Sequence, residues 1–459
     1  MEKRRMDAGK LRAAGRKLLR SGARFLAGTL TAALCLSGAP GARGQAAGNV
    51  WAADERKEEK SSTTSQLYAQ SAVLMDAENG RVLLQKNGDD VMPMASTTKI
   101  MTCILTLELG NGSDLAAVSS YAARQPEVRM GAKKGEVYRI GDLLYALMLE
   151  SYNDAAVIIA EYYGSKWAGL SEDIASHSEE ESRRAVLAFT GKMNEKAAQL
   201  GCEDTFFVTP NGLDATLTVE YEGRTAERAH STTARDLALI MSYCVTDSPA
   251  KEAFLEVTRT QSHTFGDYQK TEGGDYAAGD RSISCANHNA FLQMMDGALS
   301  GKTGFTGKAG YCYVGALSRD GKTFSVALLA CGWPNNKTWK WHDARILMEY
   351  GLENYETYDI YEGRELEPVP VLNGQKEMVS LTAEPEKIEL LLGPEDEVEV
   401  EWSLPDSLEA PVERGDEVGK QSYLVNGELY AFIPVKAGET VPEITYPYCI
   451  RKVLRALLL

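Results

Sequence analysis

The sequence predicts an α+β fold, in which strands from both ends of residues 67–356 form one antiparallel sheet and a helical lobe is inserted between them. Apolar stretches flank an Asn-Gly pair at 79–80 and an Asp-Gly pair at 320–321, and such pairs are strong hairpin signals. The chain between these hairpins is mostly helical in its periodicity. A crevice between sheet and lobe is a natural ligand site.

The elements of this segment follow in order. Residues 71–77 and 81–86 are predicted strands, and apolar runs predict helices over 96–109 and 141–163. The chain to about residue 260 reads as mostly helical, with a solvated acidic loop at 172–181, and 266–280 reads as a turn-rich loop. Strands are expected again at 311–318 and 322–331, followed by a helix at about 341–353.

A small β-rich domain is expected at residues 360–447. Charged and apolar residues alternate over 397–402, and Asn426-Gly427 marks a hairpin. This segment contains no obvious nucleophile, base or metal cluster, so we expect it to be a spacer or docking module. In the tail, 448–459, apolar positions 450, 453, 454, 457 and 458 share one helical face, which is typical of a helix in a membrane interface. Packing of that helix on the β domain is the alternative.

The charge is distributed unevenly along the chain. The 459 residues carry 65 acidic and 49 basic side chains, a net charge of −16. Residues 1–52 hold ten basic and two acidic residues, so they carry +8 and the remainder carries −24. A basic start followed by a thirteen-residue, mainly apolar stretch at 25–37 predicts a signal peptide over 1–52, with cleavage before Ala53 or near Ala46, and a polar linker over 53–66. An uncleaved anchor or an internal amphipathic helix is the alternative.

The composition of the chain excludes several classes of protein. With 44% apolar and 25% charged residues, the chain is an ordinary globular protein, neither fibrous, wholly disordered nor multi-span. Its acidity argues against a nucleic-acid partner, because phosphate backbones are repelled. The seven cysteines after the expected signal show no metal-type spacing, and their odd number leaves at least one unpaired. A disulfide among Cys285, Cys312 and Cys331 stays open.

Three short motifs carry the chemistry. They occur in the order Ser96-x-x-Lys99, Ser151-x-Asn153 and Lys302-Thr303-Gly304. A second S-x-x-K at 248–251 has a proline inside its turn, whereas S-x-N and K-T-G each occur once. The joint pattern is that of β-lactamases and penicillin-binding proteins. The five histidines form no recognisable triad or zinc motif, and a P-loop-like stretch at 297–303 is one residue too short.

The spacing of these residues suits acyl transfer. Ser96 opens a helix, where the dipole favours developing negative charge, and Lys99 lies one turn further on the same face. A partly desolvated lysine has a lowered pKa and acts as a base. Ser151 and Asn153 can relay protons and hold a substrate amide. The lysine and threonine of the third motif suit a carboxylate, and Gly304 permits close backbone approach.

Over residues 67–447 the chain resembles the serine-type D-alanyl-D-alanine carboxypeptidases, the low-molecular-mass penicillin-binding proteins. The likeness extends through the contexts at 94–102, 141–145 with 151–156, 193–194 with 207–214, and 302–306 with 309–312. It implies a β-lactamase/transpeptidase-like catalytic domain at 67–356, a β-rich domain and an amphipathic tail.

The resemblance also implies the role of each residue. Ser96 would be the acylated nucleophile and Lys99 its general base, assisted by Ser151 and Asn153. Lys302 and Thr303 would bind the terminal carboxylate, and the N–H groups of Ser96 and Phe305 would form the oxyanion hole. Two positions depart from the family. Asn211 stands where a histidine is common, and we assign Asn211 a structural role. The carboxylate-binding arginine of the family has no clear match in this sequence. Lys337, Lys340 and Arg345 are the candidates to replace it.

The predicted function is an exported carboxypeptidase that removes the last D-alanine from peptidoglycan pentapeptide stems through a Ser96 acyl-enzyme, without metal or organic cofactor. Its expected partners are stem peptides, β-lactams as covalent inhibitors, and the outer face of the cytoplasmic membrane through the tail. A D,D-endopeptidase stays open, because it uses the same residues. A class A β-lactamase is disfavoured because no E-x-x-L-N lies between Asn153 and Lys302. A non-catalytic wall-binding protein has no need of Lys99 beside Ser96.

Overall fold

A computed structural model describes residues 61–221, 224–384 and 387–458, which divide into two compact units that meet between Asn354 and Tyr355. The predicted signal peptide lies outside the described residues, as do linker residues 53–60. Residues 61–65, expected to be linker, are helical instead. In this short helix the Thr64 and Ser65 hydroxyls donate to carbonyls three residues earlier in the chain.

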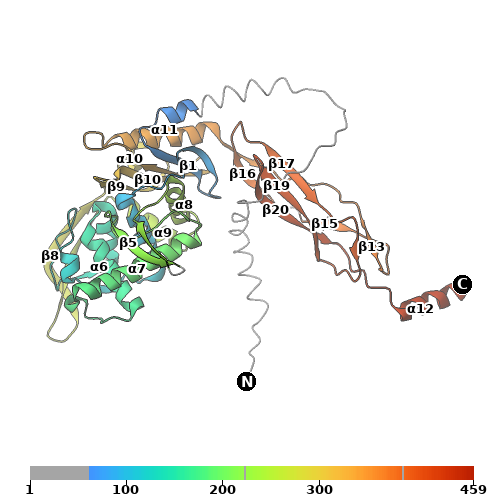
Figure 1. The fold of residues 1–459 in the computed structure, drawn as a ribbon, viewed down its shortest axis with the longest axis horizontal. Coiled ribbons are helices and arrows are strands. Elements are labelled where there is room, and N and C mark those ends of the chain that lie inside the picture. The colour runs from blue at the N-terminus through green and yellow to red at the C-terminus, as the bar shows by residue number, and fades with distance from the viewer. Residues whose placement is uncertain (1–60, 222–223, 385–386, 459) are drawn as a thin grey trace. The chain divides into compact units, whose positions relative to one another are not determined.

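The N-terminal unit is built on a five-stranded antiparallel sheet of order β2-β1-β11-β10-β9 (Figure 1). The strands are β1 Ser71–Asp76, β2 Val82–Lys86, β9 Ala298–Thr306, β10 Gly310–Arg319 and β11 Lys322–Leu329. Asp320 and Gly321 both have positive φ, of 57° and 75°, which is the backbone that a tight hairpin requires. The predicted sheet, drawn from both ends of the segment, is confirmed.

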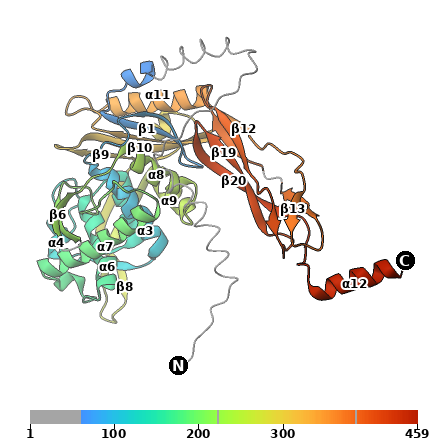
Figure 2. The same cartoon turned by 45° about the vertical axis from the view of Figure 1, so that its right-hand side comes forward.

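Helices cover both faces of this sheet (Figures 1 and 2). Helix α11, Trp339–Asn354, lies on one face, where Gly351 allows a close approach to Leu74 and Phe324. Helix α8, Ala234–Val245, lies on the other face, where Ser242 Oγ is 2.8 Å from Ser325 Oγ. The sheet is therefore buried between α11 and the helical lobe.

The lobe surrounds α3 and α6, whose apolar residues belong to the main core. Its helices are α3 Lys99–Leu109, α4 Ser120–Ala123, α5 Ile140–Tyr145, α6 Asn153–Ala168, α7 Glu179–Gln199, α9 Lys251–Arg259 and α10 Phe291–Met294, with a 3₁₀ turn η1 Ala95–Thr98, a π turn η2 Ala146–Glu150 and a 3₁₀ turn η3 Ile174–Ser176. The single helix predicted over 141–163 is wrong. Ser151 adopts φ +66° and separates the π turn from α6.

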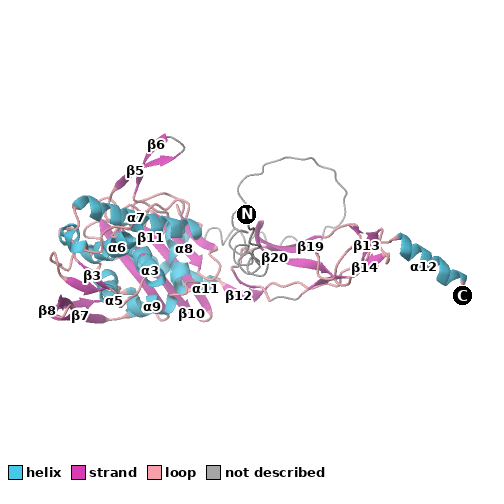
Figure 3. Ribbon diagram, turned by 90° about the horizontal axis from the view of Figure 1, so that it is seen from below, coloured by secondary structure: helices cyan, strands magenta, loops and turns pink. Residues whose placement is uncertain are grey.

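Two other predictions for this unit need correction. Residues 266–280 were expected to form a loop, but β7 Ser262–Lys270 and β8 Tyr276–Ala286 are a hairpin in a sheet of order β3-β4-β7-β8, with β3 Leu115–Ala117 and β4 Val137–Arg139. Antiparallel strands tolerate polar residues on a solvated face, so the composition did not exclude strands. The chain up to about residue 260 was expected to be mostly helical, but it also contains a projecting hairpin of β5 Thr216–Tyr221 and β6 Arg224–Ala229 (Figure 3).

The acidic stretch at 172–181 is only partly a loop. Its last three glutamates form the first turn of α7. Ser178 and Glu181 make a reciprocal capping box, and acidic side chains are favourable at this helix end. Helix capping therefore explains part of the acidic composition.

The C-terminal unit is β-rich, as predicted. Its strands are β12 Glu356–Asp359, β13 Val369–Leu372, β14 Met378–Val379, β15 Leu381–Ala383, β16 Glu389–Leu392, β17 Val398–Ser403, β18 Leu408–Glu409, β19 Glu417–Val425 and β20 Glu428–Ala437. They form sheets of order β15-β20-β19-β17, β14-β13-β18 and β12-β16. Because β12 pairs with β16, residues 356–359 belong to this unit and not to the catalytic segment.

The C-terminal unit ends in helix α12, Tyr446–Leu457, which extends away from its strands (Figure 3). In the described part of the chain, no helix combines the length and apolar character needed to cross a membrane. All seven cysteines from Cys103 onward are unpaired, so the disulfide left open by the sequence is not formed. Six of the seven are buried, and Cys449 is exposed.

Candidate active site

Ser96 lies in the 3₁₀ turn η1, one turn before the α-helix that the sequence placed there. The preceding residue, Ala95, has φ +49°, a conformation that costs an L-residue on the order of 1 kcal/mol. The turn packs directly against β9: a Cβ at Gly304 would lie 2.9 Å from Ser96 N. Glycine at 304 therefore allows the strand and the Ser96 backbone to approach each other.

Lys99 is fully buried beside Ser96. Its Nζ lies 2.9 Å from Ser96 Oγ, 2.9 Å from Asn153 Oδ1 and 2.6 Å from the Asn211 carbonyl. Burial and, second, the charge of Lys302 hold the pKa of Lys99 well below its usual range. Lys99 Nζ donates to all three atoms, and the Ser96 hydroxyl donates to the Asn211 carbonyl at 3.4 Å. A neutral Lys99 has one lone pair, which can accept the Ser96 proton during attack.

Asn153 is oriented by the loop that contains Pro126. Its Nδ2 donates to the Pro126 carbonyl at 3.1 Å, so Oδ1 faces Lys99. The neighbouring Asp154 carboxylate accepts backbone N–H groups from residues 130, 131 and 132 at 2.9–3.0 Å. Asp154 thus fixes the loop that fixes Asn153.

Ser151 and Lys302 form the second contact of the site. The left-handed Ser151 places its Oγ 2.9 Å from Lys302 Nζ, which also donates to the Thr303 carbonyl at 2.8 Å. Burial lowers the pKa of Lys302 to about 7. The sequence did not predict a strand at this motif, which lies inside β9, with Lys302 opposite Val314.

The end of β9, from Thr303 onward, is partly exposed. Thr303 is half-buried, and Phe305 is 41% exposed with its ring 4.6 Å from Tyr311. Lys340 is buried, with its Nζ 4.9 Å from the Tyr311 ring, and burial lowers its pKa to about 8. Lys337 and Arg345 are exposed. Of the proposed arginine substitutes, Lys340 is thus linked through Tyr311 to Phe305.

The sequence missed two contributors. The Asn211 carbonyl accepts from Lys99, and a main-chain acceptor leaves no side-chain signature. The only available signal was the adjacent Gly212, whose φ of +86° marks a tight turn. His230, which belongs to none of the motifs, contacts the η1 turn through Thr98.

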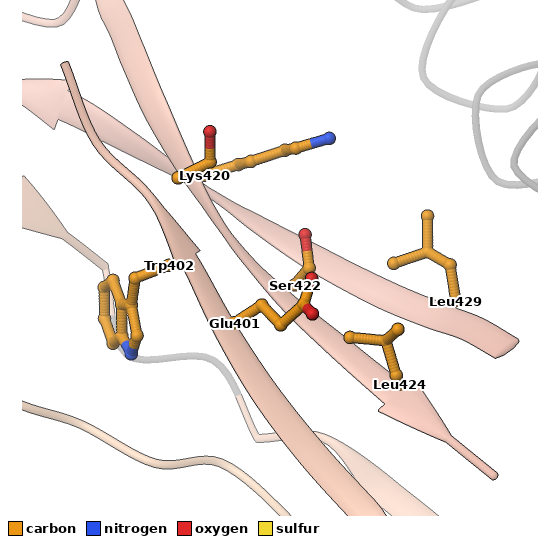
Figure 4. Close-up of a pocket in the computed structure, with 7 residues that line it drawn as sticks. Glu401, Trp402, Lys420, Ser422, Leu424 and Leu429 are labelled. Carbon is orange, nitrogen blue, oxygen red and sulfur yellow. The ribbon is translucent and has the colours of Figure 1, made fainter. Parts of the chain in front are cut away.

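A separate hollow lies in the C-terminal unit (Figure 4). Its lining residues come from β17, β19 and β20: Glu401, Trp402, Ser403, Lys420, Ser422, Leu424 and Leu429. Every residue that the three motifs predict lies in the other unit, so this hollow is not the candidate active site.

The model of the D-alanyl-D-alanine carboxypeptidase family, peptidase family S11, matches residues 57–171 and 182–330, which include all three motifs. The chain belongs to the D-alanyl-D-alanine carboxypeptidase family. The match is interrupted at residues 172–181, the acidic segment. Residues 355–443 match the C-terminal domain of penicillin-binding protein 5.

Individual relatives of this carboxypeptidase cover both units. D-alanyl-D-alanine carboxypeptidase DacF of Bacillus subtilis (strain 168) is 29% identical over 386 residues, 82% of this chain and 86% of the relative. DacA of Haemophilus influenzae is 26% identical over 393 residues, 83% of this chain and 87% of the relative. A crystal structure of penicillin binding protein 5 from Haemophilus influenzae has the same fold, with a TM-score of 0.59, 23% identity, and coverage of 82% and 98%. The predicted family, fold class and serine-peptidase activity are confirmed.

Proposed function

We propose that this carboxypeptidase removes the terminal D-alanine from peptidoglycan stem peptides through an acyl-enzyme on Ser96. Its family comprises penicillin-binding proteins that act on such peptides and on β-lactams. The observation that carries the assignment of Ser96 is the arrangement around Lys99 Nζ, where two acceptors and one hydroxyl surround a buried amine. In this arrangement Lys99 is the base, and the proton that it removes is that of the Ser96 hydroxyl.

Acylation follows from this arrangement. As Ser96 Oγ attacks the carbonyl carbon of the penultimate D-alanine, its proton passes to the lone pair of Lys99. The N–H groups of Ser96 and Phe305 stabilise the oxyanion. The C–N bond then breaks, and the departing amine of the terminal D-alanine receives the proton that Lys99 had accepted, with Ser151 as the proposed relay. Water then attacks the ester carbonyl and gives a proton to Lys99. The C–O bond breaks, Ser96 Oγ takes that proton back, and the shortened peptide is released.

Lys302 and Thr303 are proposed to recognise the terminal carboxylate. In the described part of the chain, two of the three ammonium N–H groups of Lys302 bind Ser151 and the Thr303 carbonyl, which leaves the third for a substrate. A carboxylate would stabilise the charged form of this buried amine. Penicillin carries an equivalent carboxylate beside its reactive carbonyl, so it should acylate the same serine.

Release of D-alanine from a synthetic peptide ending in D-Ala-D-Ala tests the proposal. Ser96→Ala should abolish release, whereas Ser248→Ala, in the other S-x-x-K sequence, should retain it. Mass spectrometry should find a long-lived penicillin adduct on Ser96. Equal release by Ser96→Ala and the wild type would remove Ser96 from the mechanism, and rapid penicillin turnover would favour a β-lactamase. A cross-linked peptide dimer offered in parallel measures endopeptidase activity.

We also propose that residues 1–52 direct export and that α12 attaches the enzyme to the outer face of the cytoplasmic membrane. Relatives of this chain are extracytoplasmic cell wall enzymes. Five apolar side chains at positions 450, 453, 454, 457 and 458 are 43–86% exposed and share one face of the tail. Arg451, Lys452 and Arg455 would each add roughly 1 kcal/mol near anionic lipid.

Co-sedimentation with anionic vesicles tests the attachment. Val453→Asp/Leu457→Asp in the full chain should abolish binding at low salt, and Tyr446→Asp, at the start of α12, should weaken it less. Equal sedimentation of the wild type and the double variant would exclude α12 as the anchor and favour an uncleaved N-terminal segment.

A further inference from the structure

His230 is a buried side chain outside the three motifs, and it connects two parts of the site. It is 3% exposed and follows β6. Its Nδ1 accepts the backbone N–H groups of Val208 at 3.0 Å and Thr209 at 3.3 Å. Since both partners are donors, Nδ1 carries no proton and the neutral ring holds its proton on Nε2.

The hydrogen bonds beyond His230 have a fixed direction. His230 Nε2 lies 2.7 Å from Thr98 Oγ1, so the ring donates and the hydroxyl oxygen accepts. The Thr98 hydroxyl then donates its own hydrogen to the Ala95 carbonyl at 2.8 Å. A chain of donors thus runs from the 208–209 backbone to the carbonyl in front of Ser96.

The Ala95 carbonyl belongs to the peptide group that contains the Ser96 N–H. In a trans peptide the carbonyl and the N–H point in opposite directions, so holding the oxygen orients the proposed oxyanion donor. This peptide group needs support because Ala95 has φ +49°. Gly212 supports it from the other side: a Cβ there would lie 1.9 Å from the Ala95 oxygen.

The loop held by His230 also carries the acceptor of the proposed base. Residues 208–209 bind the imidazole, and Asn211, two residues further along, accepts from Lys99 Nζ at 2.6 Å. One side chain therefore touches the segment that orients the oxyanion donor and the segment that orients Lys99.

We propose that His230 is a positioning residue that acts through Thr98 to align the Ser96 N–H and the Asn211 carbonyl for acylation. The inference rests on the proposed function of Ser96. His230 itself transfers no proton: burial is the main cause that lowers its pKa to about 3, so the ring is neutral at the pH of the reaction.

Thr98→Val is the sharpest test because it removes one hydroxyl and keeps the shape of the side chain. The acylation rate constant for penicillin and the affinity for a peptidyl boronic acid, which forms a tetrahedral adduct on serine, should both fall about tenfold to a hundredfold. Peptide affinity, measured in the Ser96→Ala background, should change less than about twofold. Thr98→Ser should restore most of the rate, and His230→Gln, which keeps a donor toward Thr98, should lose less than His230→Leu.

Thr106→Val is the matched control, since Thr106 is also a buried threonine and its hydroxyl donates within α3 to the Thr102 carbonyl. A loss that is equal in Thr98→Val and Thr106→Val, or that falls equally on peptide affinity and boronate affinity, would show a merely structural role and overturn the inference. Unchanged acylation in Thr98→Val would overturn it directly. Persistent D-alanine release by Ser96→Ala would instead refute the proposed function, so the two failures are distinguishable.

Discussion

A methyl group added at Gly304 should slow acylation with little effect on the rest of the fold. The new Cβ would lie 2.9 Å from Ser96 N, 3.0 Å from Ala95 Cβ and 3.1 Å from Thr97 N. Ordinary Cβ contacts begin at 3.4 Å, so β9 and the η1 turn must separate by about 0.5 Å. Two of the three obstructing atoms are backbone nitrogens, which no rotamer change can move.

This separation acts directly on the proposed oxyanion hole, because Ser96 supplies one donor from the turn and Phe305 supplies the other from the strand. Loss of one such donor costs about a hundredfold to a thousandfold in rate, and a misplacement of about 1 Å costs about a hundredfold. A shift of about half that size should therefore lower the acylation rate constant of Gly304→Ala about tenfold to a hundredfold. Overpacking should lower the free energy of unfolding by about 1–3 kcal/mol.

Stopped-flow acylation by penicillin, together with denaturant unfolding, measures both effects. Gly307→Ala is the matched control: Gly307 follows β9, and a Cβ there meets nothing within 4 Å. The reasoning fails if Gly304→Ala acylates within about threefold of the wild type while remaining folded. It also fails if Gly307→Ala loses as much activity as Gly304→Ala.

Three further predictions concern the buried polar groups. Lys99→Met should abolish acylation by peptide and penicillin, whereas Lys302→Met should chiefly raise KM for carboxylate ligands. The same fractional loss for both variants with a charged and an uncharged acylating probe would contradict these separate roles of the two lysines. Asp154→Asn should lower the free energy of unfolding by about 1–3 kcal/mol and slow acylation, because its amide replaces an acceptor facing backbone N–H groups; unchanged urea unfolding would count against it. His230 has a folded pKa of about 3 against an ordinary 6.5, so its contribution to stability is complete above pH 6.5. This contribution declines as the pH falls toward 3, by up to about 1.4 kcal/mol per pH unit. His230→Gln should flatten this decline in urea titrations relative to the wild type, in which the buried Asp76 and Asp236 act in the opposite direction.

The sequence predicted the sheet and the three motifs because their signals are local. The Asn-Gly and Asp-Gly pairs specify hairpins within a few residues, and Ser96 and Lys99 lie one helical turn apart. The break at Ser151 was missed because its cause is not local. Apolar residues continue on both sides of it with helical spacing, whereas the left-handed serine is held by Lys302, 151 residues away in the chain. A periodicity argument counts only neighbours along the chain.

Strand β9 and the Asn211 carbonyl escaped prediction for related reasons. The strand contains glycine, serine and lysine at buried positions, so it lacks the apolar alternation of a typical strand. Two of these buried residues serve the site: Lys302 faces Ser151, and Gly304 faces the Ser96 backbone. Likewise, Asn211 contributes its main-chain oxygen, which any residue type possesses. Function replaced the usual folding signals at the positions that matter most for catalysis.

The two lysines of the site must hold opposite protonation states, and the charge of Lys302 helps to keep Lys99 neutral. Lys302 binds a carboxylate only when charged, and its charge is the second cause, after burial, of the lowered pKa of Lys99. A substrate carboxylate next to Lys302 would stabilise that charge without reaching Lys99, where the Ser96 proton must be accepted. Lys302→Met therefore has two effects: it removes carboxylate recognition, and it raises the pKa of Lys99, which lowers the neutral fraction of the base at a given pH. With an uncharged acylating probe the first effect disappears, so the acid limb of the acylation rate should move to higher pH in Lys302→Met. An unmoved acid limb would mean that burial alone keeps Lys99 neutral and that the two amines act independently.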